Sequence, residues 1–428
     1  MSKQISAGLA LLIVFCLGTG SFLPKGQAQA GAASSTQHTA IVSMTAAMLK
    51  ETSELRELSI LRSVKSGAQS RREIERMIVK NLDTDTTPAE MHAAEVLLKV
   101  FGLAPKEFAY RTFLIKLLTE QVAGYYDPKA QQFYLADWIE FEGQKPVMAH
   151  ELTHALQDQH FNLKRFENWP KGDSDAELAA HALIEGDATL AMMLYMAKNP
   201  LVALAFIRSL GGDEATEQFK QAPRALRESL LFPYEEGSAW ATQLYKRGGW
   251  ELVSQAFTKL PQSTEQILHA EKYFSYEAPQ KLTLPDLKSA LGPAWKRVDY
   301  DVNGEWGCYL ILDEFLNDTT ESKQAAAGWA GDRFALYETG KPDQFFVAQL
   351  TAWDTPLDAQ EFFSAYARRT AKRYADAREL KSDDDRFEWQ TSSGRVVLEL
   401  RGSRVAIVEG VPSSTDAGKL LNTIWQQR

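Results

Sequence analysis

The feature that most constrains the fold is a pair of histidines, four residues apart, in the segment His-Glu-Leu-Thr-His at residues 150–154. Two histidines at this spacing lie one above the other on one face of a helix, so both imidazoles can bind one metal ion while the glutamate projects beside it. We therefore predict a helix from Pro146 to about His160. Met148, Leu152 and Ala155 form its apolar back, which leaves the histidines and the glutamate on the opposite side.

An acidic residue inside a second, apolar helix is the candidate for a third ligand. This helix is expected to run from Ser174 to Lys198, and Glu185 lies in its apolar stretch at residues 182–188. A zinc hydrolase holds its ion with three protein ligands and keeps a fourth position for water. A buried carboxylate without a partner is costly, and metal binding removes that cost. Gly186 lowers helix propensity by about 1 kcal/mol relative to alanine, which is expected if this helix approaches the metal helix closely.

Other roles for the side chains of this region stay open. Glu185 could instead form a salt bridge on a half-exposed helix face. His181, one turn before Glu185, is the rival third ligand. Asp187 and Asp158 could accept hydrogen bonds that orient an imidazole, or they could be ordinary surface carboxylates.

The first thirty residues are typical of a cleaved export signal. Lys3 provides a positive start, residues 7–17 form an apolar run too short to cross a bilayer comfortably, and Ala-Gln-Ala at 28–30 is a small-x-small cleavage signal. A retained N-terminal anchor is the alternative. The apolar stretch at 188–197 is too short for a membrane span. We therefore expect an exported protein, periplasmic or extracellular, with no transmembrane segment in the mature chain.

Charge and cysteine content exclude two further possibilities. The chain has a formal net charge of −9, and loss of residues 1–30 removes Lys3 and Lys25 and no acidic residue, which leaves −11. A chain this acidic is a poor nucleic-acid binder, so no nucleic-acid partner is expected. Cys308 is the one cysteine beyond the leader, so no internal disulfide can form. Its apolar neighbours at 307–312 predict a buried and unreactive thiol.

The mature chain is predicted to contain three regions. Residues 31–118 form amphipathic helices, two of which begin with capping boxes at 70–73 and 87–90. Residues 119–284 contain the metal motif, further helices and a short strand at 132–135.

Residues 285–428 have a different pattern, in which strands and helices are mixed. The strands are expected at 334–338, 345–353, 386–391, 395–401 and 404–408, and the helices at 358–378 and 414–427. The predicted fold class is therefore α+β, with a mainly helical metal-binding domain that contains a short β element, followed by a smaller C-terminal domain.

These segments resemble the zincin metallopeptidases of the gluzincin type, in particular exported bacterial members of that superfamily. The resemblance is carried by residues 120–161, which include Glu-Gln-Val-Ala-Gly-Tyr-Tyr-Asp-Pro and His-Glu-Leu-Thr-His-Ala-Leu-Gln-Asp-Gln-His-Phe, and by Glu-Gly-Asp-Ala-Thr at 185–189. Segments 263–273 and 328–333 extend it over most of the mature chain. Ala270 departs from the proline that is common in the relatives, and this difference does not touch the metal residues.

The resemblance implies a zincin-like catalytic domain that binds Zn²⁺ through His150, His154 and Glu185, with Glu151 as the general base. The ion lowers the pKa of its bound water, the base accepts the proton, and the hydroxide attacks a carbonyl of a protein or peptide substrate.

Several points of function stay open. The tetrahedral intermediate also needs a hydrogen-bond donor, and His269 or Tyr273 could supply it, although either could equally be a packed helix residue. The strand at 133–135 could pair with an extended substrate if it lies at the edge of the cleft. A non-catalytic zinc-binding or interaction protein is one alternative, which the intact Glu151 argues against. A zinc hydrolase of a non-peptide amide is the other, since its water activation is identical.

Overall fold

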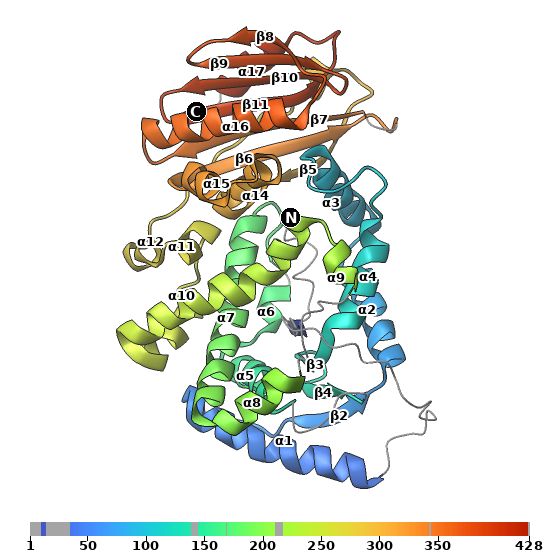
Figure 1. Ribbon diagram of the computed structural model, residues 1–428, viewed down its shortest axis with the longest axis vertical. Coiled ribbons are helices and arrows are strands. Elements are labelled where there is room, and N and C mark those ends of the chain that lie inside the picture. Colours follow the sequence, from blue (N-terminus) through green and yellow to red (C-terminus); the bar gives the residue numbers. More distant parts are fainter. Residues whose placement is uncertain are drawn as a thin grey trace.

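The computed structural model describes residues 10–13, 35–137, 144–167, 169–209, 217–341 and 344–426. Most of the leader expected at residues 1–30 lies outside this part of the chain. The fold is α+β, as predicted. A helical body with a small sheet occupies one end of an elongated molecule, and a large antiparallel sheet occupies the other end (Figure 1).

Four helices come first in the body: α1 (Ser35–Arg56), α2 (Arg71–Asp85), α3 (Pro88–Val100) and α4 (Tyr110–Gln121). Two of them, α2 and α3, begin where the sequence predicts. Both predicted capping boxes are present. In the first, Glu73 Oε2 accepts hydrogen bonds from Ser70 N at 2.8 Å and Ser70 Oγ at 2.7 Å. In the second, Glu90 Oε2 accepts hydrogen bonds from Thr87 N at 2.9 Å and Thr87 Oγ1 at 2.7 Å. Each box satisfies amide groups that a helix start leaves without partners.

The small sheet lies beside the metal helix and has the strand order β1-β3-β4-β2. Its strands are β1 (Ala10–Ile13), β2 (Lys65–Gln69), β3 (Val122–Asp127) and β4 (Gln132–Ala136). The strand predicted at 132–135 is therefore confirmed as β4. It lies between β3 and β2, so both of its edges are paired and the edge position considered for it was wrong. β3 and β4 both pack against the metal helix, and the outer edge of β3 pairs antiparallel with β1.

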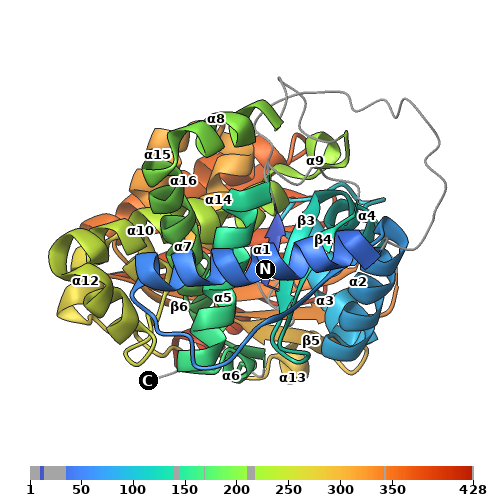
Figure 2. The same ribbon diagram turned by 90° about the horizontal axis from the view of Figure 1, so that it is seen from below.

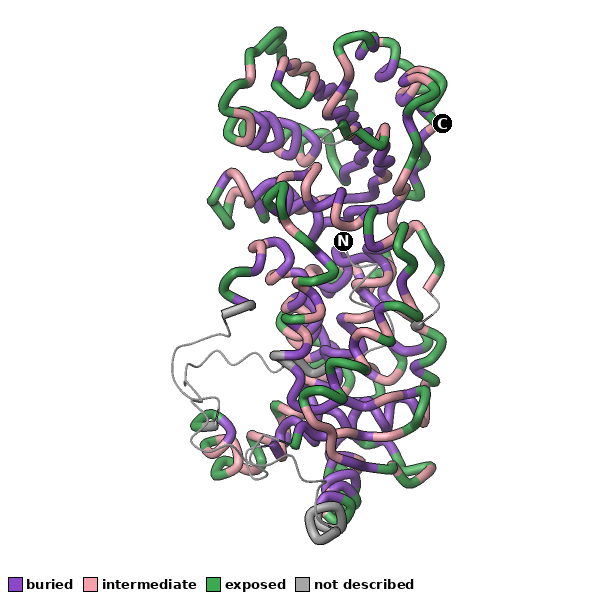
Figure 3. The backbone as a smooth tube through the Cα atoms, turned by 90° about the vertical axis from the view of Figure 1, so that its right-hand side faces the viewer, coloured by how far each residue is buried: buried purple, intermediate pink, exposed green. Residues whose placement is uncertain are grey.

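Three long helices form the centre of the body: α5 (Lys145–Phe161), α7 (Ser174–Lys198) and α10 (Arg224–Ala256). The predicted metal helix is α5, and α7 has the predicted bounds. α7 packs against α5 and α10, and α1 lies across α5 and α7 (Figure 2). The central helices are buried along much of their length (Figure 3).

Gly186 lies at a very close contact between α7 and α10. A Cβ atom on Gly186 would lie 2.9 Å from Gly237 Cα and closer still to the Gly237 carbonyl, and one on Gly237 would lie 3.2 Å from Ala182 Cα. The close approach expected from this glycine is present, but its partner is α10 and not the metal helix α5. Backbone contact at this point sets the position of α7 against α10.

The shorter helices of the body are α6 (Lys164–Glu167), α8 (Pro200–Ser209), α9 (Glu217–Gln221), α11 (Thr264–Leu268) and α12 (Ala270–Ser275). Within the described ranges, no single helix combines the length and the apolar composition that crossing a membrane requires. α7 and α8 reach these values only as a pair, and the pair is bent by 113°.

The C-terminal sheet is antiparallel throughout, with the order β5-β6-β7-β11-β10-β9-β8. The strands are β5 (Lys296–Asp301), β6 (Trp329–Glu338), β7 (Phe345–Trp353), β8 (Arg378–Ser382), β9 (Arg386–Thr391), β10 (Gly394–Arg401) and β11 (Arg404–Val411). All five predicted strands are confirmed, and the two edge strands β5 and β8 are additional. Every residue of β8 is exposed, and β5 is exposed or half-buried over all but its last residue.

Helices cover both faces of this sheet. α14 (Gly304–Leu316), α15 (Thr319–Ala326) and α16 (Pro356–Arg373) lie on the face toward the body, and α13 (Lys288–Leu291) and α17 (Ala417–Trp425) lie on the other. The helix predicted at 358–378 ends at Arg373. Tyr374 is already extended, because its hydroxyl donates to buried Glu409 at 3.0 Å, and a tertiary contact therefore overrides local helix propensity. Cys308 lies buried in α14, as predicted.

One hydrophobic core crosses the boundary predicted between the metal-binding and C-terminal domains. It contains side chains of α3, α7 and α10 together with those of α14, α16 and the sheet. Phe232 of α10 packs on Trp306 of α14, with ring centroids 4.7 Å apart. Buried Arg369 of α16 binds Glu409 at 2.7 Å and donates to the Phe101 carbonyl at 2.6 Å. The sheet is thus packed and hydrogen-bonded onto the body.

We expect a chain ending at Tyr276 to aggregate or to lose cooperative unfolding. Removing α14 and the sheet would expose large apolar side chains such as Phe232, each at a cost of about 1.5–3 kcal/mol, and several together exceed the roughly 5–15 kcal/mol by which a typical domain is stable. Gel filtration and a thermal melt followed by circular dichroism would check this. A monomeric product with one sharp melt would show instead that the two parts fold independently.

We expect Gly186→Ala to destabilise the protein by at least ~2 kcal/mol, because the new methyl group has no space against the α10 backbone. Gly67→Ala is the matched control. Its Cβ would lie 3.3 Å from the end of the flexible Gln132 side chain, and no positive φ is involved. Urea denaturation of both variants measures the difference, and an unchanged midpoint for Gly186→Ala would contradict the contact.

Candidate metal centre

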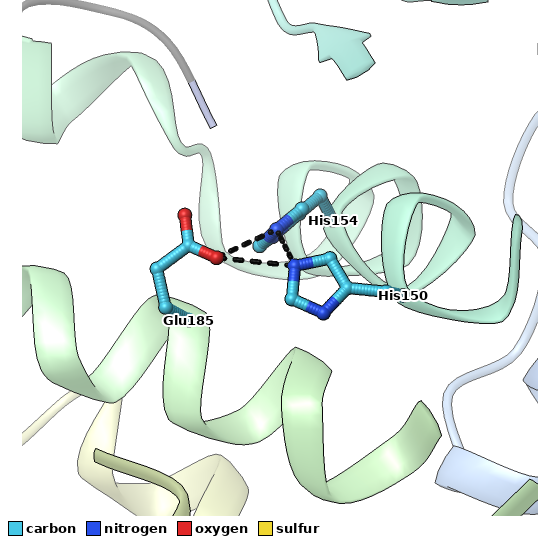
Figure 4. A group of neighbouring side chains, drawn as sticks. All are labelled: His150, His154 and Glu185. Carbon is cyan, nitrogen blue, oxygen red and sulfur yellow. Dashed lines mark hydrogen bonds and ion pairs between the residues drawn. The ribbon is translucent and has the colours of Figure 1, made fainter. Parts of the chain in front are cut away.

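Three side chains from two helices converge on one point (Figure 4). His150 and His154 lie one turn apart on α5, and Glu185 faces them from α7. The two Nε2 atoms are 3.0 Å apart, and Glu185 Oε2 lies 3.1 Å from that of His150 and 3.4 Å from that of His154. Two ligand atoms on a tetrahedral zinc ion, each about 2.0–2.1 Å from the metal, are about 3.3 Å apart. The spacing therefore fits zinc, and the predicted ligand set is brought together.

The three side chains of this cluster are buried, and their charges are coupled. All three side chains are fully buried, and His150 Nδ1 and Glu185 Oε1 have no hydrogen-bond partner among the described residues. Burial lowers the pKa of His150 to about 4, whereas in His154 the charge of Glu185 outweighs burial and raises the pKa to about 9. Burial acts to raise the pKa of Glu185, but the imidazoles hold it below its usual range. A buried anion thus faces two nitrogen donors, a zinc-type ligand set.

Gln157 determines which nitrogen of His154 faces the cluster. Its amide nitrogen donates to the Ile184 carbonyl at 3.0 Å and to Asp187 Oδ2 at 2.8 Å. The amide oxygen therefore faces His154 Nδ1, 2.8 Å away, and that nitrogen must be the donor. The Nε2 atom of His154 is then the one that faces the other two side chains, and it can bind a metal ion that displaces its proton.

Glu151, the predicted base, is buried directly after the first histidine of α5. Its Oε2 accepts a hydrogen bond of 2.8 Å from the backbone N–H of Tyr126 in β3. The small sheet therefore anchors this carboxylate beside the metal ligands.

His181, the rival third ligand, lies beside the cluster and outside its converging set. Its Nε2 is 3.8 Å from Glu185 Oε1, whereas the other oxygen of Glu185 faces the histidines. Its side chain is 16% exposed, and those of the three ligands are fully buried. The geometry therefore favours Glu185 as the third ligand.

The two aspartates considered as partners of an imidazole do not contact one directly. Asp187 Oδ2 accepts from Gln157, so it reaches His154 through that amide. Asp158 accepts from Arg62 at 2.6 Å and from the Tyr126 hydroxyl at 2.9 Å. Asp158 therefore supports β3 and orients no imidazole, whereas Asp187 helps to orient His154 through Gln157, and neither carboxylate lies on the surface.

His269 and Tyr273, the sequence candidates for oxyanion donors, lie elsewhere. His269 Nε2 is 2.8 Å from Glu305, and the Tyr273 hydroxyl donates to the Lys259 carbonyl at 2.8 Å. Both belong to the segment that packs on the N-terminal end of α7, where Thr264 binds Asp175. Asp175 precedes Glu185 by ten residues, which corresponds to about 15 Å of helix. The structure does not bring either side chain to the metal cluster.

Tyr234 is the neighbour that the sequence did not identify. Its ring stacks on that of His150 with centroids 6.1 Å apart, and it packs beside Val147 and Phe206. Nothing in the local sequence connects α10 to the metal helix, because the contact arises only when α10 and α5 both pack against α7.

A second set of carboxylates, Glu265, Glu277 and Asp354, also lies within ligand distance. Lys272 Nζ binds all three, at 2.6, 3.0 and 2.5 Å. The lysine already supplies the positive charge, so this set is an ion-pair cluster.

Comparison with known families gives one match, a domain of unknown function (DUF8575), over residues 292–421. The match covers the C-terminal sheet with α14, α15, α16 and the first part of α17, and it includes none of the candidate metal ligands. No curated protein and no solved structure matches the chain.

We expect residues 31–428 to bind about one zinc ion per chain. Glu185→Ala should weaken zinc binding at least ~10-fold, because it removes a ligand, whereas His181→Ala should change it little. Competition with a chromophoric chelator measures both affinities. The reverse ranking would make His181 the third ligand.

Proposed function

We propose that the protein is a zinc-dependent hydrolase of the gluzincin type that cleaves peptide bonds. The observation that carries the proposal is the convergence of His150, His154 and Glu185 within 3.4 Å of one another, with Glu151 next to them on the same helix. From the export signal expected at residues 1–30, we also propose that the protein acts in the periplasm or outside the cell.

Zinc bound by these ligands supplies a Lewis acid and a water molecule of lowered pKa. With the ion bound, Glu151 would accept a proton from the attacking water and would return it to the leaving amine. The Tyr126 N–H holds the carboxylate in place during both transfers, and Gln157 keeps His154 Nε2 directed at the metal.

The edge of β3 supports a polypeptide as the substrate. β1 pairs with this edge antiparallel, with Ala10 opposite Tyr126 and Ile13 opposite Val122. We propose that an extended substrate takes this place in the mature chain, since backbone pairing recognises any peptide and not a small amide. The strand would then run past Glu151, which Tyr126 contacts.

Tyr234 and His181 replace His269 and Tyr273 as proposed donors to the oxyanion. Tyr234 stacks on one ligand and His181 lies 3.8 Å from another, and both are partly exposed. A donor at such a position acts on charge that develops in the transition state.

We expect Glu151→Gln to keep about one zinc ion per chain and to lose peptide cleavage by about 10²–10⁴-fold, because the amide preserves the shape but cannot accept the proton. Glu75→Gln, the same change at an exposed position on α2, is the control and should keep full activity. Metal analysis and cleavage of a quenched peptide library, with and without chelator, give both readouts.

Two results would change the proposal. Full activity of Glu151→Gln would remove the assigned base. Zinc binding without cleavage of any peptide by the parent protein would favour a non-catalytic zinc protein or an amidase for small substrates.

A further inference from the structure

Arg56, the last residue of α1, is buried deep between the central helices. Its exposed fraction is 0%, and so is that of its partner Asp187. Arg56 Nε and Nη2 donate to the two carboxylate oxygens of Asp187 at 2.6 and 3.1 Å. Both Nη atoms also donate to Ser254 Oγ at 3.1 Å, and the guanidinium lies 4.4 Å from the ring centre of Trp250. A fork of this kind fixes the carboxylate in position and in rotation.

The fixed carboxylate controls a hydrogen-bond chain that ends at a metal ligand. Asp187 Oδ2 accepts from Gln157 Nε2 at 2.8 Å, and Gln157 Oε1 accepts from His154 Nδ1 at 2.8 Å. The chain therefore runs from α1 through α7 to α5. Without Arg56, Asp187 would lose its charge partner and its fixed rotation. The Gln157 amide nitrogen would then keep only the Ile184 carbonyl as a fixed acceptor, so turning the amide over would cost less. A turned amide points its N–H₂ group at His154 Nδ1. Two donors cannot bond to each other, so the proton of the imidazole moves from Nδ1 to Nε2, the nitrogen that should bind the metal.

We propose that Arg56 is a positioning residue of the metal centre, an inference that rests on the proposed function. Acting through Asp187 and Gln157, it holds His154 with Nε2 turned toward the other two ligands. The N-terminal helix α1 is in this way a part of the metal centre, although it supplies no ligand.

The decisive experiment compares two buried arginines. Arg56→Met should lower the zinc affinity of the full mature chain by about 10–100-fold, the usual effect of losing a group that orients a metal ligand. Arg369→Met is the matched control, because Arg369 is also 0% exposed and pairs with a buried carboxylate, Glu409, in the C-terminal sheet. Both variants should lower the melting temperature, and only Arg56→Met should lower zinc affinity.

Cobalt(II) substitution gives a second readout that stability alone does not change. The visible absorption bands of bound cobalt report its ligand geometry, so Arg56→Met should alter them and Arg369→Met should not. If Arg56→Met does not fold, Arg56→Lys takes its place, because lysine keeps the charge but cannot make the two-point contact with Asp187. The same measurements then test the positioning role. In addition, Arg56→Met combined with Gln157→Leu should bind zinc no more weakly than Gln157→Leu alone, because both changes break one chain.

The outcomes separate this inference from the proposed function. If the parent binds zinc and Arg56→Met binds it equally tightly with the same cobalt spectrum, the positioning role is overturned and the hydrolase proposal stands. If the parent protein binds neither zinc nor cobalt(II), the positioning role and the hydrolase proposal are both overturned. Additive losses in the double variant would also overturn the role, since they would mean that Arg56 and Gln157 act separately.

Discussion

The structure depends on how α7 buries its carboxylates. Asp175, Glu185 and Asp187 are each no more than 3% exposed, and an unpaired carboxylate at such depth would be strongly destabilising. Each one is met by a different element. Thr264 of α11 donates to Asp175, the histidines of α5 face Glu185, and Arg56 of α1 binds Asp187. One helix therefore fixes the positions of three others, and the metal centre is the middle of the three contacts.

The segment Glu185–Asp187 shows this most clearly. Successive residues of a helix point about 100° apart, so the three side chains face three directions. Glu185 faces α5, Gly186 meets the α10 backbone, and Asp187 faces Gln157 and Arg56. A side chain at the middle position would push α7 away from α10 and shift both carboxylates. The glycine is thus as important for the metal geometry as its charged neighbours.

The convergence of the three candidate ligands could be predicted from the sequence because each one is marked locally. The histidines have helical spacing, and Glu185 is an acidic residue in an apolar helix. The failures concern contacts between distant segments. The partner of Asp187 lies 131 residues earlier, and neither spacing nor composition indicates that pair. His269 was chosen for its chemistry, but the packing of its segment on the far end of α7 carries it away from the metal. The C-terminal strands could be predicted because their hydrophobic alternation is strong. The core that joins the sheet to the helical body could not be predicted, because its side chains come from both parts of the chain.

The two edge strands of the C-terminal sheet determine whether many copies of the protein can polymerise by strand pairing. An open sheet can lengthen by pairing its last strand with that of another molecule, and charged, solvated edges oppose such growth. β8 reads Arg-Glu-Leu-Lys-Ser and is exposed throughout, and β5 begins with Lys-Arg and contains two aspartates. Both ends of the sheet are therefore closed to strand addition. For a protein that we propose to be exported, such edges protect many copies against polymerisation.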